Sequence, residues 1–254
     1  MAIQPSDATI KARSKKRFKA ASRLENEYLR SLRGLVRNID QLIKGMITLD
    51  GSEKDTSVLI NMLEKYAETI SPWAESVASK ILQRIFEKDA QSWAELGRDV
   101  GKALKKELDD APTGYAFRLF MDEQVKLIKS LPLDAARRVH DLTIEGITTS
   151  RRADDIAKDI LKIGNITMNR AKLIARTEVA RTASGITMER AKSVGSTHYI
   201  WRTSGDADVR ESHKHMANKI IAWDNPPEVD PGKHYHAGMF PNCRCYPEPI
   251  LIEE

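Results

Sequence analysis

The side chains best suited to chemistry gather near the end of the chain. The only two cysteines, Cys243 and Cys245, stand two positions apart. Four of the six histidines lie in the same window, at His213, His215, His234 and His236. Zinc prefers cysteine thiolates and imidazole nitrogens in tetrahedral sets, usually drawn from two separated clusters. The two cysteines with His213 or His215, and with His234 or His236, would supply four ligands, so the window predicts a candidate zinc site. His213, Cys243 and Cys245 are its principal members.

A second interpretation of the same residues needs no metal. The C-x-C spacing is tighter than the C-x₂₋₄-C of common zinc modules. On a strand, one of Cys243 and Cys245 would pack inward as a small apolar residue. The histidines would then be solvent-facing loop residues. Both interpretations stay open at this stage.

Acidic residues beside His213 raise the possibility of catalysis. Asp206, Asp208 and Glu211 lie just before it, and Glu178 lies upstream. A carboxylate with a histidine performs general acid–base chemistry or holds a divalent ion for phosphodiester hydrolysis. A metal-dependent nuclease would use Asp208, His213 and Glu178.

A non-catalytic interpretation explains these acids equally simply. So dense a mixture of acids, arginines and histidines forms ion pairs, and Asp206 or Asp208 suits the N-cap of a short helix ending near Ala217. No phosphate-binding glycine loop, H-E-x-x-H motif or G-x-S-x-G motif occurs. We therefore expect a non-enzyme. Arg176 and Glu178 would hold the C-terminal loops by charge-assisted hydrogen bonds.

A basic segment stands near the other end of the chain. Between positions 11 and 23 there are seven basic residues and no acid. They are Lys11, Arg13, Lys15, Lys16, Arg17, Lys19 and Arg23. Such a block suits a phosphate backbone or an acidic partner surface. The alternative is an ordinary solvated start of a helix.

The N-terminal half of the chain has the pattern of long amphipathic helices. Apolar residues three and four apart from Leu24 to Met46 predict a helix over about residues 8–48. A second helix begins near Thr56. A third begins at Pro72 with Ser71 as its N-cap and buries Trp73, Val77, Ile81 and Ile85. A separate fourth helix starts near Trp93 and ends before residue 114.

Helices continue until residue 195 and strands follow. Breaks are expected at 131–132, at 146–150 with Ser150 capping the next helix, and at 164–165. The last long helix ends at Gly195 as a C-cap. Strands are expected over 198–203, 219–223 and 245–252. The predicted class is α+β and mainly α-helical, with helical arms over 1–130 and a second domain over 131–254.

Four separated motifs occur in an order typical of one family. They are A-R-T-E from Ala175, W-R-T-S-x-D-x-D-V-R-x-x-H from Trp201, P-x-x-x-D-P-G ending at Gly232, and P-N-C-R-C-x-P-x-P from Pro241. This combination resembles the Mu F-like head morphogenesis family of tailed phages. The family pattern maps onto Arg176, Thr177, Glu178, Trp201, Asp208, Arg210, His213, Gly232, Asn242, Cys243, Arg244 and Cys245.

The resemblance implies a minor capsid protein in the capsid interior of a virion, assembled in the host cytoplasm. Its implied partner is the portal protein, with packaged double-stranded DNA, scaffold or major capsid protein as further candidates. Portal-bound or oligomeric copies are expected. The alternatives remain a divalent-metal nuclease and a zinc-stabilised DNA-binding module.

Two departures from the family pattern bear on the site. Asn218 stands where many relatives have a turn glycine, and asparagine tolerates the left-handed conformation that such a turn needs. Met239 and Phe240 precede the final motif where many relatives have a histidine, which weakens the zinc interpretation unless His234 or His236 substitutes.

The composition bounds the class of protein. Its hydrophobic content of 41% supports a folded core, and a net charge of +5 accompanies 30% charged residues. No apolar run is long enough to span a membrane and no signal peptide is recognisable, so neither a membrane protein nor a secreted one is expected.

Overall fold

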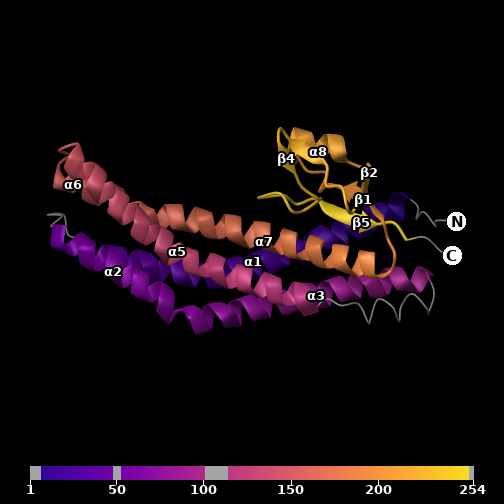
Figure 1. Ribbon diagram of the computed structural model, residues 1–254, viewed down its shortest axis with the longest axis horizontal. Helices are drawn as coiled ribbons and strands as arrows, with labels where there is room; N and C mark the ends of the chain where they lie inside the picture. The colour runs from indigo at the N-terminus through magenta and orange to yellow at the C-terminus, as the bar shows by residue number, and fades with distance from the viewer. Residues whose placement is uncertain (1–6, 48–52, 101–113, 252–254) are drawn as a thin grey trace. The chain divides into compact units, whose positions relative to one another are not determined.

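The computed structural model describes residues 7–47, 53–100 and 114–251, with side chains described for 15–47, 56–95 and 114–251. The predicted class, α+β and mainly helical, is confirmed (Figure 1). The helices are α1 (Asp7–Met46), α2 (Glu53–Thr69), α3 (Ser71–Val100), α5 (Gly114–Thr148), α6 (Ala153–Leu161), α7 (Ile163–Ser193) and α8 (Glu211–Met216). The strands are β1 (His198–Arg202), β2 (Ile220–Ala222), β3 (Glu228–Asp230), β4 (Lys233–His234) and β5 (Tyr246–Pro249).

The chain forms two compact units, each built from separate segments. Unit 1 comprises 1–26, 80–120 and 176–254, and unit 2 comprises 27–79 and 121–175. The unit boundaries fall inside α1, α3, α5 and α7. The predicted domain boundary near residue 130 lies within α5 and stays a prediction. Among the described residues, no helix is both long and apolar enough to cross a membrane.

The predicted helical stripes form the core of unit 2. On α1, Leu32, Leu35 and Ile39 are buried, as the three-and-four spacing predicts. The other apolar side chains buried in this unit come from α2, α3, α5, α6 and α7, and include Leu59, Leu63, Ile128, Leu131, Val139 and Ile160. The helices of this unit are therefore held by ordinary apolar burial.

Two expectations for α3 are wrong. Ile81 and Ile85 are buried as expected, but Trp73 is 37% exposed, because Ala74, Ala78 and Leu82 form the rest of the buried stripe. No separate helix starts at Trp93, since α3 continues without a break to Val100. Residues 86–92 contain neither glycine nor proline, so nothing local ends the helix there. Residues 101–113, where that fourth helix was expected to end, lie outside the described residues.

Two predicted helix boundaries in the second half are also wrong. Pro132 lies inside α5 without breaking it. Buried neighbours such as Leu131 and Ala135 offset the hydrogen bond that proline removes. Ser150 does not cap α6; with φ of 53° it ends α5 in the left-handed conformation. The Arg151 N–H donates to the Gly146 carbonyl at 2.9 Å, which is the bond of a Schellman ending.

The three predicted strands are confirmed and form one antiparallel sheet in the order β2-β1-β5. Tyr199 of β1 lies opposite Ile221 on one side and Pro249 on the other. Gly195 ends the preceding helix with φ of 75°, as predicted. Asn218 adopts φ of 67°, so the expected left-handed turn before β2 is present. The short β3-β4 pair was not predicted.

Candidate functional site

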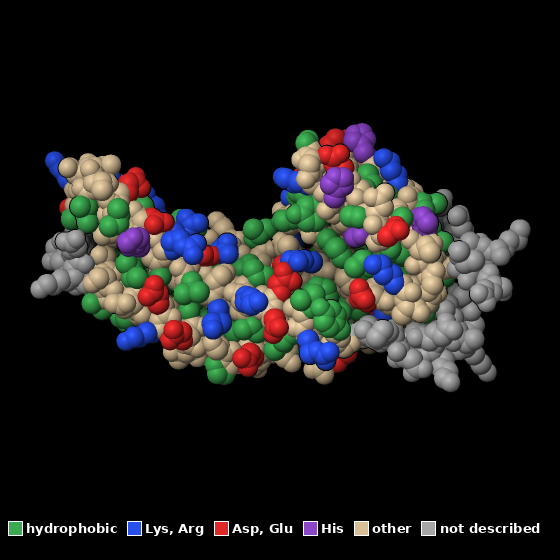
Figure 2. Space-filling view, viewed as in Figure 1, with side chains coloured by type: hydrophobic (Ala, Val, Ile, Leu, Met, Phe, Trp, Pro, Cys, Tyr) green, Lys and Arg blue, Asp and Glu red, His purple; other side chains and the backbone are tan. Residues whose placement is uncertain are grey.

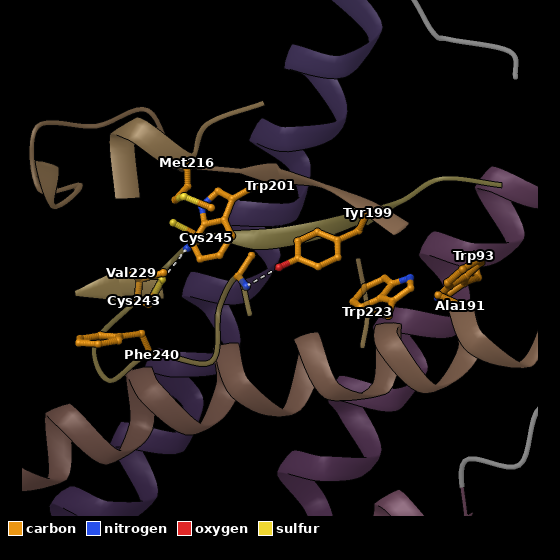
Figure 3. Close-up of a cluster of buried hydrophobic side chains, with 11 residues drawn as sticks. Trp93, Ala191, Tyr199, Trp201, Met216, Trp223, Val229, Phe240, Cys243 and Cys245 are labelled. Carbon is orange, nitrogen blue, oxygen red and sulfur yellow. Dashed lines mark hydrogen bonds between the residues drawn. The ribbon is translucent and has the colours of Figure 1, made fainter. Parts of the chain in front are cut away.

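The C-terminal module, residues 196–251, contains most of an aromatic core to which Trp93 of α3 and Ala191 of α7 also contribute (Figure 3). Alternation along β1 points Tyr199 and Trp201 inward, and both are fully buried. The Tyr199 and Trp223 rings pack with centroids 4.4 Å apart. The Trp223 Nε1 donates to Ser196 Oγ at 3.2 Å, which satisfies its buried N–H. This core positions the polar side chains of the site.

A buried hydroxyl and a buried imidazole meet inside this core. The Tyr199 hydroxyl accepts from the Ala237 N–H at 3.3 Å and lies 3.2 Å from His236 Nδ1. Burial raises the pKa of Tyr199 and lowers the pKa of His236. Both groups are therefore neutral at pH 7, with the tyrosine donating to the imidazole. His236 acts as a packing and hydrogen-bonding residue.

Two thiols and one imidazole form a second cluster, here called the thiol–imidazole cluster. His213 Nδ1 lies 3.4 Å from Cys243 Sγ and 3.6 Å from Cys245 Sγ. The Cys245 N–H points to Cys243 Sγ at 3.3 Å. His213, Cys243 and Cys245 are 2%, 3% and 5% exposed, so solvent screens the interactions among them only weakly. Helix α8 supplies the imidazole, and the loop before β5 supplies the thiols.

The cluster shifts the proton equilibria of its two thiols in opposite directions. The hydrogen bond from the Cys245 thiol, helped by the His213 ring, lowers the pKa of Cys243. The same hydrogen bond, together with burial, raises the pKa of Cys245. The protein environment by itself therefore favours one thiolate and one thiol.

The structure does not bring the other histidines to this cluster. His215 and His234 are exposed, and His234 contacts the Pro226 carbonyl at 3.2 Å. His236 is engaged with Tyr199. Exposed histidine side chains are visible on the surface of the C-terminal module in Figure 2. Only the principal members of the predicted metal set come together.

Arg176 and Thr177 of α7 fasten the C-terminal loop. The Arg176 Nη1 donates to Asn242 Oδ1 at 3.0 Å, and the Asn242 N–H donates to Thr177 Oγ1 at 2.9 Å. Arg176 Nε also lies 3.7 Å from Glu25. Asn242 has φ of 60°, a conformation that asparagine tolerates better than most residues. The A-R-T and P-N-C motifs thus bind each other directly.

Two further arginines hold the loops around the thiol–imidazole cluster. The Arg244 Nη2 contacts Asp206 at 3.1 Å and Asp208 at 3.2 Å. The Arg210 Nη2 donates to the Pro241 carbonyl at 3.1 Å, and its guanidinium lies 4.6 Å from the Phe240 ring centroid. These contacts join the two motifs that contain the cluster residues.

The predicted aspartate N-cap of α8 is wrong. Arg210 occupies the cap position and makes no side-chain cap bond. The Asp206 carboxylate accepts instead from the Asp208 N–H at 3.2 Å, closing a local turn. The two aspartates are positioned by this turn to receive Arg244 rather than to cap the helix.

Glu178 does not join a candidate nuclease site. It is buried on α7, 4% exposed, and its carboxylate lies 4.0 Å from Arg181 Nη1. Within the described residues, the one group of potential metal ligands is His213, Cys243 and Cys245. Glu178, Asp208 and His213 therefore do not form a shared metal site.

The basic N-terminal segment is partly used inside unit 1. The Arg17 Nη2 donates to Thr187 Oγ1 at 2.9 Å, and its guanidinium lies 4.7 Å from the Tyr246 ring centroid. Lys16 pairs with Glu95 but stays exposed. Lys15, Lys19 and Arg23 are also exposed, whereas the side chains of Lys11 and Arg13 lie outside the described residues.

Two hollows adjoin these residues within unit 1. One, of about 640 Å³, is here called the cationic cleft, since its charged lining is mostly basic: Lys15, Arg17, Arg176, Arg202 and Arg244, with Glu25 and Asp206. The other, of about 280 Å³, is here called the arginine pocket. It lies against the thiol–imidazole cluster and is lined in part by Arg176, Arg210 and Arg244.

Several structural residues of this unit carry no motif in the sequence. Asp89 of α3 is 5% exposed and accepts from Thr187 Oγ1 at 2.7 Å. Arg190 Nε pairs with it at 2.9 Å. Gly238 has φ of 82°, and a Cβ there would lie 2.2 Å from Ser184 Oγ. A lone acid, an arginine and a glycine far apart in sequence give no local signal for these contacts.

In the described residues, most of the motif side chains pack in the module or fasten its loops. Residues 137–247 match the family described as Phage Mu protein F like protein. The resemblance inferred from the motifs is thereby confirmed for this region of the chain. An uncharacterized protein of Haemophilus influenzae is 27% identical over 95% of the chain, which spans 56% of that relative's length. No solved structure matches the chain.

Proposed function

We propose that this chain is a minor head protein of a tailed phage that binds the portal protein inside the capsid and assists head assembly or genome packaging. The observation that carries the proposal is the Mu F-like match over residues 137–247. Within it, Arg176, Thr177 and Asn242 hold a loop rather than line a reaction centre. Such use of the motif residues supports an assembly role over a catalytic one.

An exposed apolar stripe supports the idea of a protein partner. On α5, Leu133, Ile144 and Ile147 are 41%, 48% and 51% exposed. Positions 133, 144 and 147 are separated by eleven and three residues, so they share one side of the helix. Apolar side chains grouped on one helix face are a common docking surface for a partner. We assign this stripe to the portal.

The portal assignment is tested by co-expression with the portal protein of the same phage. The wild-type chain should co-purify with portal rings, and the I144S/I147S variant should lose most of this binding while remaining folded. The matched control is V58S/M62S, which removes exposed apolar side chains of 46% and 36% exposure from α2. A wild-type chain that never accompanies assembled rings would overturn the proposal, and equal loss in both variants would remove the stripe from it.

The basic segment supports a contact with packaged DNA. Lys15, Lys16 and Lys19 are exposed on α1, and Lys15 also lines the cationic cleft. Arg17 contacts Thr187 and Tyr246 inside unit 1, so deleting the whole basic segment would disturb the packing of this unit as well as remove charge. Substitution of the three lysines is therefore the cleaner experiment.

Salt dependence measures this contact directly. The logarithm of affinity for duplex DNA falls with the logarithm of salt by about 0.9 per neutralised phosphate. K15Q/K16Q/K19Q should reduce that slope by roughly 2–3. R30Q/R33Q/R37Q removes three exposed arginines from the same helix and should leave the slope nearly unchanged. Equal slopes for the wild type and the lysine variant would remove the segment from the DNA interaction.

A further inference from the structure

We propose that the thiol–imidazole cluster is a zinc site with three protein ligands, His213 Nδ1, Cys243 Sγ and Cys245 Sγ, and a fourth position filled by water from the arginine pocket. The proposal concerns the folding and chemistry of the module and does not depend on the portal or DNA assignments. All three donor atoms lie within 4.8 Å of one another.

The two nitrogen–sulfur separations are close to those that tetrahedral zinc requires. Zinc–sulfur bonds of about 2.3 Å and zinc–nitrogen bonds of about 2.0–2.1 Å, at the tetrahedral angle, place sulfur and nitrogen about 3.6 Å apart. The imidazole nitrogen lies 3.4 Å from Cys243 Sγ and 3.6 Å from Cys245 Sγ. Little rearrangement would be needed to hold an ion between the three atoms.

The His213 ring is held with one nitrogen toward the sulfurs. The Trp201 and Phe240 rings pack against it edge to face, with centroids 5.6 Å and 5.5 Å away. Its other nitrogen, Nε2, is buried and has no hydrogen-bond partner among the described side and main chains. A ring proton on Nε2 leaves Nδ1 as the lone-pair donor that a metal needs. Aromatic packing here takes the orienting role that a hydrogen bond more often performs.

The surroundings favour a transition metal over a hard cation. Two thiolates and an imidazole are ligands for zinc, whereas calcium and magnesium require oxygen. A zinc ion would bring both thiols to the thiolate form, because a coordinating thiol loses its proton. Its charge would offset the cost of burying two thiolates side by side.

The fourth position has no protein ligand in the described part of the chain. Asp208 lines the arginine pocket, but it lies outside the ligand group and pairs with Arg244. The pocket of about 280 Å³ has room for water beside the cluster. Three protein ligands with an open position are typical of a zinc ion that keeps an exchangeable ligand.

The metal would tie two segments of the module that are distant in sequence. Helix α8 supplies His213, and the loop before β5 supplies Cys243 and Cys245. A structural zinc contributes its binding free energy to folding, so removal of the ion should destabilise the module. The ion would therefore cross-link α8 to the loop before β5 within the C-terminal module.

Metal analysis of the full-length protein tests the site. Protein purified without added chelator should carry about one zinc per chain by elemental mass spectrometry. Cys245→Ser should lose the metal, while the exposed His215→Ala on the same helix should retain it. A folded wild-type protein that stays metal-free even after incubation with zinc would overturn the proposal, independently of how Cys245→Ser folds.

The fourth ligand is tested separately by X-ray absorption at the zinc edge. Two sulfurs, one imidazole nitrogen and one further oxygen are expected. Substitution of cobalt should produce a thiolate-to-cobalt charge-transfer band and the d–d bands of a tetrahedral site. A third sulfur or a second imidazole in the absorption spectrum would contradict the open position, and oxygen-only coordination would contradict the site.

Discussion

Replacement of Asn242 tests the fastening of the C-terminal loop to α7. The residue accepts a hydrogen bond from Arg176 Nη1 at 3.0 Å and has a left-handed φ of 60°. A hydrogen bond to a charged group contributes about 1.5–3 kcal/mol when buried. The Arg176 side chain is 42% exposed, which reduces this to about 1 kcal/mol. Left-handed φ costs a residue with a Cβ about 1–2 kcal/mol.

These two contributions separate in a pair of variants. Asn242→Gly loses the hydrogen bond but tolerates the positive φ, so we expect a loss of about 1 kcal/mol in unfolding free energy. Asn242→Ala loses the bond and gains backbone strain, so about 2 kcal/mol is expected. Urea unfolding followed by tryptophan fluorescence measures both, since Trp93, Trp201 and Trp223 all belong to unit 1.

A double-mutant cycle isolates the contact itself. Arg176→Met and Asn242→Gly should show a coupling energy of about 1 kcal/mol, because each removes the same hydrogen bond. Equal stability of Asn242→Ala and Asn242→Gly would refute the argument from backbone strain. A coupling energy near zero would refute the view that this hydrogen bond holds the loop.

Two further predictions concern buried charge and pH in unit 1. Arg190→Met removes the guanidinium that lies 2.9 Å from the buried Asp89 and leaves it the Thr187 hydrogen bond and the charge of Arg17, so the unfolding free energy at pH 7 should fall by less than the roughly 3–5 kcal/mol of a buried charge with no partner. Burial already raises the pKa of Asp89, so this loss of stability should shrink as the pH falls and the carboxyl takes a proton. Replacing both Asp89 and Arg190 by apolar residues should recover most of the lost stability. Burial lowers the pKa of His236 below 6.5, so the stability that depends on its neutral ring is complete above pH 6.5 and is lost as the pH falls through the lower folded-state value. In calorimetric scans from pH 7.5 to 5, His236→Gln should flatten this dependence, and a slope equal to that of the wild type would contradict the assignment.

Local patterns predicted much of the fold. The three-and-four spacing on α1 and the alternation on β1 involve residues that are close in sequence. Both elements could therefore be predicted without a structure. The helix break predicted at Pro132 is wrong, because the burial of neighbouring apolar residues offsets the free-energy cost of a proline inside a helix. The β3-β4 pair was missed because strands of three and two residues have too few positions to show a pattern.

The site was predictable in its membership but not in its arrangement. The clustering of cysteines and histidines predicted a special region, and the family motifs named Arg176, Asn242 and His213. The sequence favoured His213, but its contact with the two cysteines depends on which side of α8 faces them, and that is set by tertiary packing. The pairing of Asp89 with Arg190 joins residues 101 positions apart, and no local spacing reports such a contact.

The central claim, a minor head protein bound at the portal, is tested most directly by quantitative mass spectrometry of purified particles of the phage that encodes this chain. We expect the chain to be present in filled heads at a fixed, low ratio to the portal protein, and to be absent from heads that lack the portal. Particles that are complete without it, or a copy number that follows the major capsid protein instead of the portal, would contradict the account.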